Sequence, residues 1–233
     1  MHTQNLTISQ IPAVLWGEPS QRVYLFVHGK QGSKADAADF AAEATARGFQ
    51  VLSFDLPQHG DRKNLPTPCD IPNSTQDLHS IWEYARKHWQ AISLYACSIG
   101  AYFSLLAYQD CPIQHCLFHS PILNMEQLIQ NMMQWSGVTE AQLQTQKQIP
   151  TAFGETLDWA YLCYVRAHPV ECWDVPTAIL YGSTDSMTER SVLDAFVKAH
   201  HCRLTVMENG EHWFHTKEQL AFASSWMHTE LAT

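Results

Sequence analysis

The sequence predicts an α/β protein with a mostly parallel sheet covered by helices on both faces. Short, continuous apolar runs alternate with helical patterns along most of the 233 residues, and such runs are typical of strands buried on both sides. Neither G-x-G-x-x-G after the first long strand nor G-x-x-x-x-G-K-[ST] is present, which weighs against a nucleotide-binding doubly wound fold. With 45% apolar residues, we expect a single domain over 1–233, interrupted by an insertion at 124–173.

The elements are expected from local patterns in chain order. An N-terminal hairpin opens the chain, and each later strand is a short apolar run such as RVYLFVH or QVLSFD. Ser33 is placed to cap the first helix and Gly48 to end it. The expected strands are 6–11, 13–16, 22–28, 50–55, 91–96, 113–118, 178–181 and 203–207. The expected helices are 34–47, 75–88, 98–109, 188–199 and 216–227.

The most informative stretch is 91–106, AISLYACSIGAYFSLL, where an apolar strand runs directly into a helical pattern. A turn this sharp holds its central residue in a strained conformation and needs small residues two positions before and after it. Centring the turn on Ser98 puts Ala96 and Gly100 at those positions. Centring it on Cys97 would put Tyr95 and Ile99 there, so we interpret Cys97 as a small neighbour packed under the turn.

Two further polar residues follow predicted strands later in the chain. The run ILYG leads to Asp185, and the run LTVME leads to His212. In parallel sheets, ligands bind beyond the carboxyl ends of the strands, so Ser98, Asp185 and His212 are expected at one edge of the sheet.

Five motifs in this order resemble the α/β-hydrolase superfamily: His28-Gly29, the turn at 55–60, A-x-S-x-G around Ser98, Gly182-x-x-Asp185 and Gly210-x-His212. From about residue 22 onward, the chain is similar to small bacterial serine esterases and lipase-like enzymes with a short helical cap. The resemblance implies an α/β-hydrolase sheet with helices on both faces and the triad order serine, acid, histidine.

The resemblance also implies roles for these residues. Ser98 would be the nucleophile, His212 its general base, and Asp185 the carboxylate that orients the imidazole. The backbone N–H groups of Ile99 and Lys30 would form an oxyanion hole. The Lys30 side chain has two interpretations: a solvated loop lysine, or a cation at the pocket mouth that favours an acidic substrate.

The alternation of strands and helices stops at 124–173, and amphipathic pieces replace it. Length and position predict a small helical cap above Ser98. We expect four large apolar residues to contribute to a substrate pocket: Met132, Trp135, Trp159 and Trp213.

The composition argues against some classes of binding partner and indicates a cellular compartment. The net charge of −9 argues against nucleic acid. Seven cysteines without C-x-x-C spacing suggest reduced thiols in a cytoplasmic protein. Neither a secretion signal nor a membrane-spanning apolar run is visible, and neither a metal nor a cofactor is expected.

The leading hypothesis is therefore a serine carboxylic ester hydrolase that acts on a small or medium substrate through an acyl-enzyme. An acyltransferase or thioesterase would use the same three residues, and a non-catalytic ligand receptor could retain them. In each case the partner is a small-molecule ester or acyl compound.

Overall fold

A computed structural model describes residues 1–232 of the chain. Its main sheet has eight strands in the order β1-β2-β4-β3-β5-β6-β9-β10. The β1–β2 and β2–β4 pairs are antiparallel, and the pairs from β4 to β10 are parallel. These strands are β1 Thr3–Ile8, β2 Ile11–Trp16, β3 Arg22–Val27, β4 Gln50–Phe54, β5 Ala91–Cys97, β6 Cys116–His119, β9 Thr177–Gly182 and β10 Arg203–Met207.

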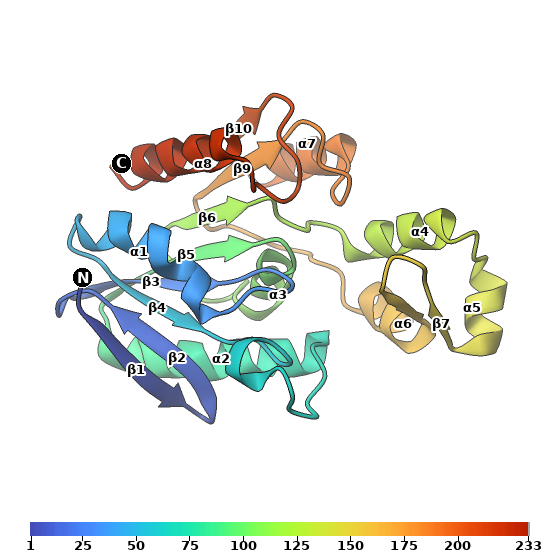
Figure 1. Ribbon diagram of the computed structural model, residues 1–233, viewed down its shortest axis with the longest axis horizontal. Helices are drawn as coiled ribbons and strands as arrows, with labels where there is room; N and C mark the ends of the chain where they lie inside the picture. The colour runs from blue at the N-terminus through green and yellow to red at the C-terminus, as the bar shows by residue number, and fades with distance from the viewer. Residues whose placement is uncertain (233) are drawn as a thin grey trace.

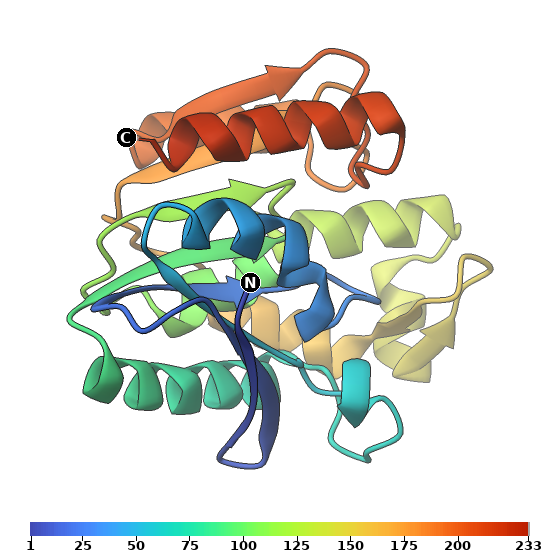
Figure 2. The same ribbon diagram turned by 60° about the vertical axis from the view of Figure 1, so that its left-hand side comes forward.

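Helices cover both faces of this sheet, with α1 and α8 packed together on one face (Figures 1 and 2). On the other face lie α2, α3 and α7. The helices are α1 Ala38–Thr45, α2 Ile71–His88, α3 Ile99–Ala107, α4 Met125–Trp135, α5 Glu140–Gln146, α6 Trp159–Ala167, α7 Arg190–Ala199 and α8 Lys217–Glu230. The predicted α/β class, with a mostly parallel sheet between two helical layers, is confirmed.

The core forms two layers because successive side chains of a strand point to opposite faces of the sheet. Along β3, Val23 and Leu25 belong to the layer under α2 and α3, whereas Tyr24 and Phe26 belong to the layer under α1 and α8. Phe26 stacks on Tyr95 of β5 with ring centroids 5.0 Å apart. Both faces of the central strands are therefore buried, which explains their continuous apolar sequences.

The parallel strands all end at the same edge of the sheet. Lys30, Ser98, Asp185 and His212 follow β3, β5, β9 and β10 respectively. Residues 124–173, called the cap segment below, follow β6 and contain α4, α5 and α6. Figure 1 shows these helices beyond the edge toward which the arrows of β5 and β6 point.

Several expected boundaries were wrong. Helix α2 begins at Ile71 rather than at residue 75, because Asp70 caps it and Pro72 is tolerated in its first turn. The expected strands put the N-terminal hairpin turn at residue 12, but it lies at Ser9 and Gln10. Both residues adopt positive φ angles, 48° and 70°, although neither is a glycine.

Other elements differ from expectation by a few residues. The helix expected over 34–47 begins as a short 3₁₀ turn, Lys34–Ala37, before α1. The strand expected over 113–118 is β6, Cys116–His119. The cap segment also contains an unpredicted two-stranded antiparallel hairpin, β7 Gln148–Pro150 and β8 Thr156–Asp158.

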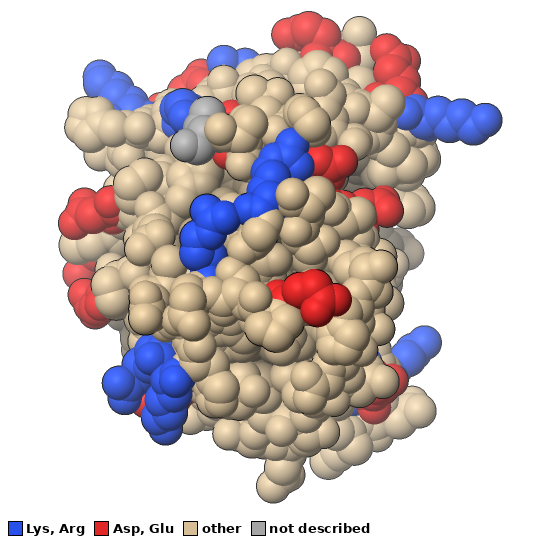
Figure 3. All heavy atoms as spheres, turned by 90° about the vertical axis from the view of Figure 1, so that its left-hand side faces the viewer, with Lys and Arg blue, Asp and Glu red and all other residues tan. Residues whose placement is uncertain are grey.

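The described residues also bear on whether the chain has a membrane-spanning helix or a strongly charged surface. Within residues 1–232, no helix is both long and apolar enough to cross a membrane. Figure 3 shows one face of the molecule, on which Lys and Arg side chains are interspersed with Asp and Glu across a wide uncharged area.

Candidate active site

Ser98 lies at the junction of β5 and α3, in a backbone conformation that L-residues rarely adopt. Its φ and ψ angles are 50° and −120°. Gly100 permits this turn, because a Cβ added there would lie 2.4 Å from the carbonyl oxygen of His28. The turn therefore brings Ser98 against the end of β3, as the small-residue pattern predicts.

Three side chains meet at this edge of the sheet in a hydrogen-bonded series. Ser98 Oγ lies 2.8 Å from His212 Nε2, and His212 Nδ1 lies 2.8 Å from Asp185 Oδ2. An ionised carboxylate only accepts hydrogen bonds, so Nδ1 carries the imidazole proton and Nε2 accepts from the Ser98 hydroxyl. This arrangement allows His212 to receive the Ser98 proton.

The Asp185 carboxylate is fully buried and held in place by its own loop. Its Oδ1 atom accepts the N–H groups of Met187 at 2.7 Å and Thr188 at 3.2 Å. With Oδ1 occupied, Oδ2 faces His212. These two N–H donors have no signature in the sequence, and they fix the carboxylate's orientation before any substrate arrives.

Cys97 is not suited to be the nucleophile. Burial raises the pKa of its thiol to about 12, so the thiol stays protonated near neutral pH and lacks the thiolate that attacks carbonyl groups. The interpretation of Cys97 as a packed neighbour of the turn agrees with this pKa.

The loop after β3 lies directly against Ser98. A Cβ added at Gly29 would be 3.2 Å from Ser98 Cβ. His28 fixes the loop: its Nε2 accepts the N–H of Leu56 at 3.1 Å, and its Nδ1 donates to the Gly29 carbonyl at 2.7 Å. Burial lowers the pKa of His28 to about 4, so the ring is neutral, as these bonds require.

The two backbone N–H groups expected to form an oxyanion hole belong to Ile99 and Lys30, in the two segments that adjoin Ser98. Ile99 is the first residue of α3, where N–H groups lack intrahelical partners and the helix dipole favours negative charge. The Lys30 N–H shares a planar trans peptide with the Gly29 carbonyl, so it points away from the His28 ring that this carbonyl contacts.

The Lys30 side chain makes a contact that the sequence does not reveal. Its side chain is half exposed, and its ammonium forms an ion pair with the carboxylate of Glu155, at the turn of the β7–β8 hairpin. Residues 125 positions apart in the chain give no local signal of such a pair. Neither expected state of Lys30, solvated or free to bind an acidic substrate, includes this partner.

The four residues expected to line a pocket lie in different surroundings. Met132 and Trp159 are partly buried against the core. Trp135 is about half exposed and makes an edge-to-face contact with Phe153. Trp213 is 74% exposed and stacks on His215. Their role in substrate binding stays a prediction.

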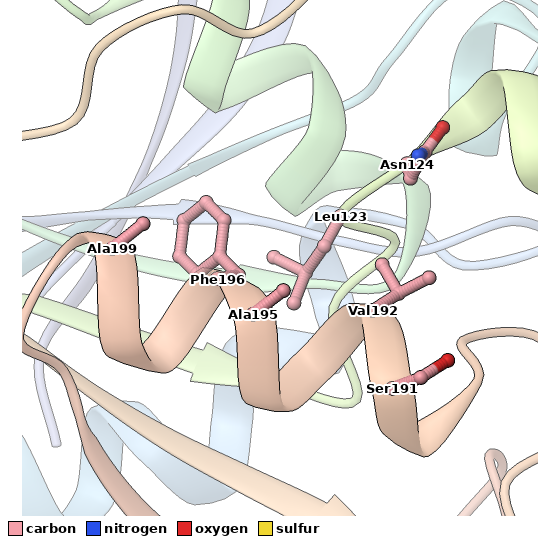
Figure 4. Close-up of a pocket in the computed structure, with 7 residues that line it drawn as sticks. All are labelled: Leu123, Asn124, Ser191, Val192, Ala195, Phe196 and Ala199. Atoms are coloured by element: carbon pink, nitrogen blue, oxygen red, sulfur yellow. The ribbon is translucent and has the colours of Figure 1, made fainter.

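A surface groove of about 400 Å³ lies between α7 and the segment after β6. Figure 4 shows that its lining comes from Leu123, Asn124 and one side of α7. Ser98, Asp185 and His212 do not line it, so this groove is separate from the candidate active site.

The parallel sheet, its covering helices and the serine at the strand-to-helix turn define an α/β-hydrolase fold. No protein-family model matches the sequence, and no curated protein matches it either. The likeness to known proteins is therefore structural.

Three solved structures illustrate this likeness. Est1E from Butyrivibrio proteoclasticus, solved with ferulic acid bound, aligns with a TM-score of 0.78 at 15% identity, over 98% of both chains. Alpha/beta hydrolase domain-containing protein 10 from mouse aligns with a TM-score of 0.76 at 14% identity, over 100% of this chain and 99% of the other. The thioesterase domain from the curacin biosynthetic pathway aligns with a TM-score of 0.62 at 15% identity, over 100% and 99%. At these identities the likeness establishes the fold, and function must be argued from the site.

Proposed function

We propose that the protein is a serine hydrolase that cleaves a carboxylic ester of a small or medium substrate through an acyl-enzyme. The observation that carries the proposal is the hydrogen-bonded series Ser98–His212–Asp185, with both distances at 2.8 Å. A serine hydroxyl is a weak nucleophile, and an adjacent imidazole oriented by a carboxylate is the usual means of activating it.

In the first half of the reaction, His212 Nε2 takes the Ser98 proton while Oγ attacks the ester carbonyl carbon. The negative charge that develops on the carbonyl oxygen would be stabilised by the N–H groups of Ile99 and Lys30. His212 then gives its proton to the departing alkoxide, which leaves as an alcohol, and the acyl group remains on Ser98.

In the second half, a water molecule takes the alcohol's place. His212 accepts a proton from this water, the resulting hydroxide attacks the acyl carbonyl, and Ser98 leaves with the proton returned by His212. The Asp185 carboxylate stabilises the imidazolium that forms in each half. Its complete burial strengthens that interaction, because water does not screen it.

The proposal is tested with purified protein and a panel of nitrophenyl esters of increasing acyl length. The panel should include a thioester, and a hydroxycinnamate ester because ferulic acid is bound in the Est1E structure. We expect turnover of at least one ester and labelling of Ser98 by a fluorophosphonate. The Ser98→Ala variant should lose both and keep its melting temperature.

Two outcomes would redirect the assignment. Labelling of Ser98 without turnover of any ester or thioester would favour an acyltransferase or a ligand receptor. Thioester turnover that exceeds ester turnover would favour a thioesterase, the class of the curacin domain. An active Ser98→Ala variant would contradict the proposed nucleophile.

A further inference from the structure

The Lys30–Glu155 ion pair joins the loop after β3 to the β7–β8 hairpin of the cap segment. Lys30 follows β3 in the loop that lies against Ser98, with Gly29 as its neighbour. Glu155 belongs to the β7–β8 hairpin of the cap segment. The pair therefore lies within one lysine side chain of the backbone N–H group proposed to contact the substrate oxygen.

The cap segment also contacts the loop that carries Asp185. Asn131 of α4 donates a hydrogen bond from Nδ2 to Glu189 Oε1 at 2.9 Å. Glu189 immediately precedes α7 and lies four positions after Asp185. Contacts of this segment thus reach loops on both sides of Ser98, and Glu155 is the residue of the cap segment that pairs with Lys30.

The charge of Lys30 has a clear consequence for substrate choice. An unpaired ammonium on the loop that lies against Ser98 would attract an acyl group that carries a carboxylate. A carboxylate already on that ammonium neutralises it and repels a second anion. Both side chains are partly exposed, at 50% and 32%, so removing the Glu155 charge would leave the Lys30 cation open to solvent and to a charged substrate.

We propose that Glu155 determines specificity by neutralising Lys30, so that the enzyme prefers uncharged acyl groups over acyl groups that end in a carboxylate. This inference rests on the proposed ester hydrolase activity. It names the substrate class of the same site: carboxylic esters with an acyl chain free of negative charge.

The test compares two nitrophenyl esters whose acyl chains have four carbons, a neutral butyrate and an anionic hemisuccinate. The measured quantity is the ratio of kcat/KM for the hemisuccinate to kcat/KM for the butyrate. In Glu155→Gln this ratio should rise about fivefold or more at low salt. The increase should shrink as added salt screens the exposed cation.

Lys30 variants complete a double-mutant cycle. In Lys30→Gln, which leaves Glu155 without its cation, the ratio should fall below that of the wild type. In the Lys30→Gln/Glu155→Gln double variant, the ratio should return to within about twofold of the wild type, because both charges are gone. A double variant whose ratio stays as high as that of Glu155→Gln would overturn the inference, because the increase would then not depend on the Lys30 cation.

Glu140→Gln is the matched control. Glu140 also belongs to the cap segment and is ion-paired, but with Arg166 rather than with Lys30. This substitution changes the net charge by the same amount, and the ratio should not change. A similar rise in Glu140→Gln would overturn the inference, because it would show an effect of net charge alone.

The remaining outcomes separate this inference from the proposed function. Equal increases for both esters in Glu155→Gln would mean that the hairpin limits access rather than selects charge, which overturns the inference. Turnover of butyrate with an unchanged ratio would overturn it and leave the ester hydrolase proposal intact. Absence of turnover of any ester by the wild type would overturn both.

Discussion

Gly182 and Gly210 approach each other so closely that a Cβ added to Gly182 would lie 2.3 Å from the Gly210 carbonyl oxygen. Gly182 ends β9 three positions before Asp185, and Gly210 lies two positions before His212. The contact between these two glycines therefore brings the carboxylate loop and the imidazole loop within hydrogen-bonding distance.

Gly182→Ala should separate the two loops. The colliding atoms are backbone rather than flexible side chain, so we expect a loss of about 3 kcal/mol in the free energy of unfolding, measured with urea. We also expect kcat on the best nitrophenyl ester to fall at least about tenfold, because the His212–Asp185 distance would increase. Gly137→Ala is the control: its surroundings are open and its φ is +64°, so it should cost about 1 kcal/mol and leave kcat unchanged. Wild-type kcat in Gly182→Ala would contradict the assigned role of this contact.

Asp185→Asn should impair turnover without unfolding the protein. The Asn amide can present its NH₂ group to His212 Nδ1, which would move the imidazole proton to Nε2 and leave Ser98 without a base. We expect kcat to fall by about 10⁴-fold with KM within about twofold of the wild type. Glu211→Gln is a nearby control, because Glu211 pairs with His215 rather than with His212. If Asp185→Asn retains normal kinetics, another carboxylate serves the imidazole.

The strained backbone at Ser98 predicts an unusual ranking of two inactive variants. With φ at 50° and ψ at −120°, any side chain is disfavoured by about 1–3 kcal/mol, whereas glycine is not. Ser98→Gly should therefore be more stable than Ser98→Ala by about 1 kcal/mol, after the greater flexibility of unfolded glycine is subtracted. Thermal and urea unfolding of the two variants measure the difference. A more stable alanine variant would show that this conformation stores no strain.

Two histidines, the buried His28 and the partly buried His119, predict a loss of stability in mild acid. Burial lowers the pKa of both His28 and His119 to about 4, from the usual 6.5. The unfolded chain therefore binds protons that the folded chain excludes as the pH falls from 6.5 toward 4, and the free energy of unfolding decreases across that range. At pH 5, each histidine should contribute a loss of about 2 kcal/mol relative to pH 7.5.

His119→Gln isolates one of these contributions. Its stability loss between pH 7.5 and pH 5 should be smaller than that of the wild type by about 2 kcal/mol, whatever the cost of losing the hydrogen bond between His119 and Tyr95. His2→Gln, at an exposed position, should leave the pH dependence unchanged. Parallel curves for His119→Gln and the wild type would contradict the low pKa of His119.

The sequence supports the prediction of the sheet and of the residues at its edge for identifiable reasons. Buried parallel strands give continuous apolar runs, and the collision expected at Gly100 limits that position to a residue without a side chain. The residues that follow the strands must then share one edge, which is why Ser98, Asp185 and His212 could be proposed together.

The structural features that the sequence did not predict are short elements or contacts between residues far apart in the chain. The β7–β8 hairpin has three residues in each strand, too few to show a period of two. The Lys30–Glu155 pair and the N–H groups that hold Asp185 depend on tertiary placement. At the turn between β1 and β2, Ser9 and Gln10 adopt positive φ. Glycine or asparagine usually occupies such positions, so the sequence does not indicate this turn.

The sheet order has a consequence for how the protein is made. Ser98 follows β5, but β9 and β10, which precede Asp185 and His212, join the sheet only after the cap segment has been synthesised. In the proposed mechanism, a nascent chain therefore carries an unactivated Ser98 until both late strands have docked. Under that mechanism, the order of synthesis would keep unfinished copies from being acylated at Ser98.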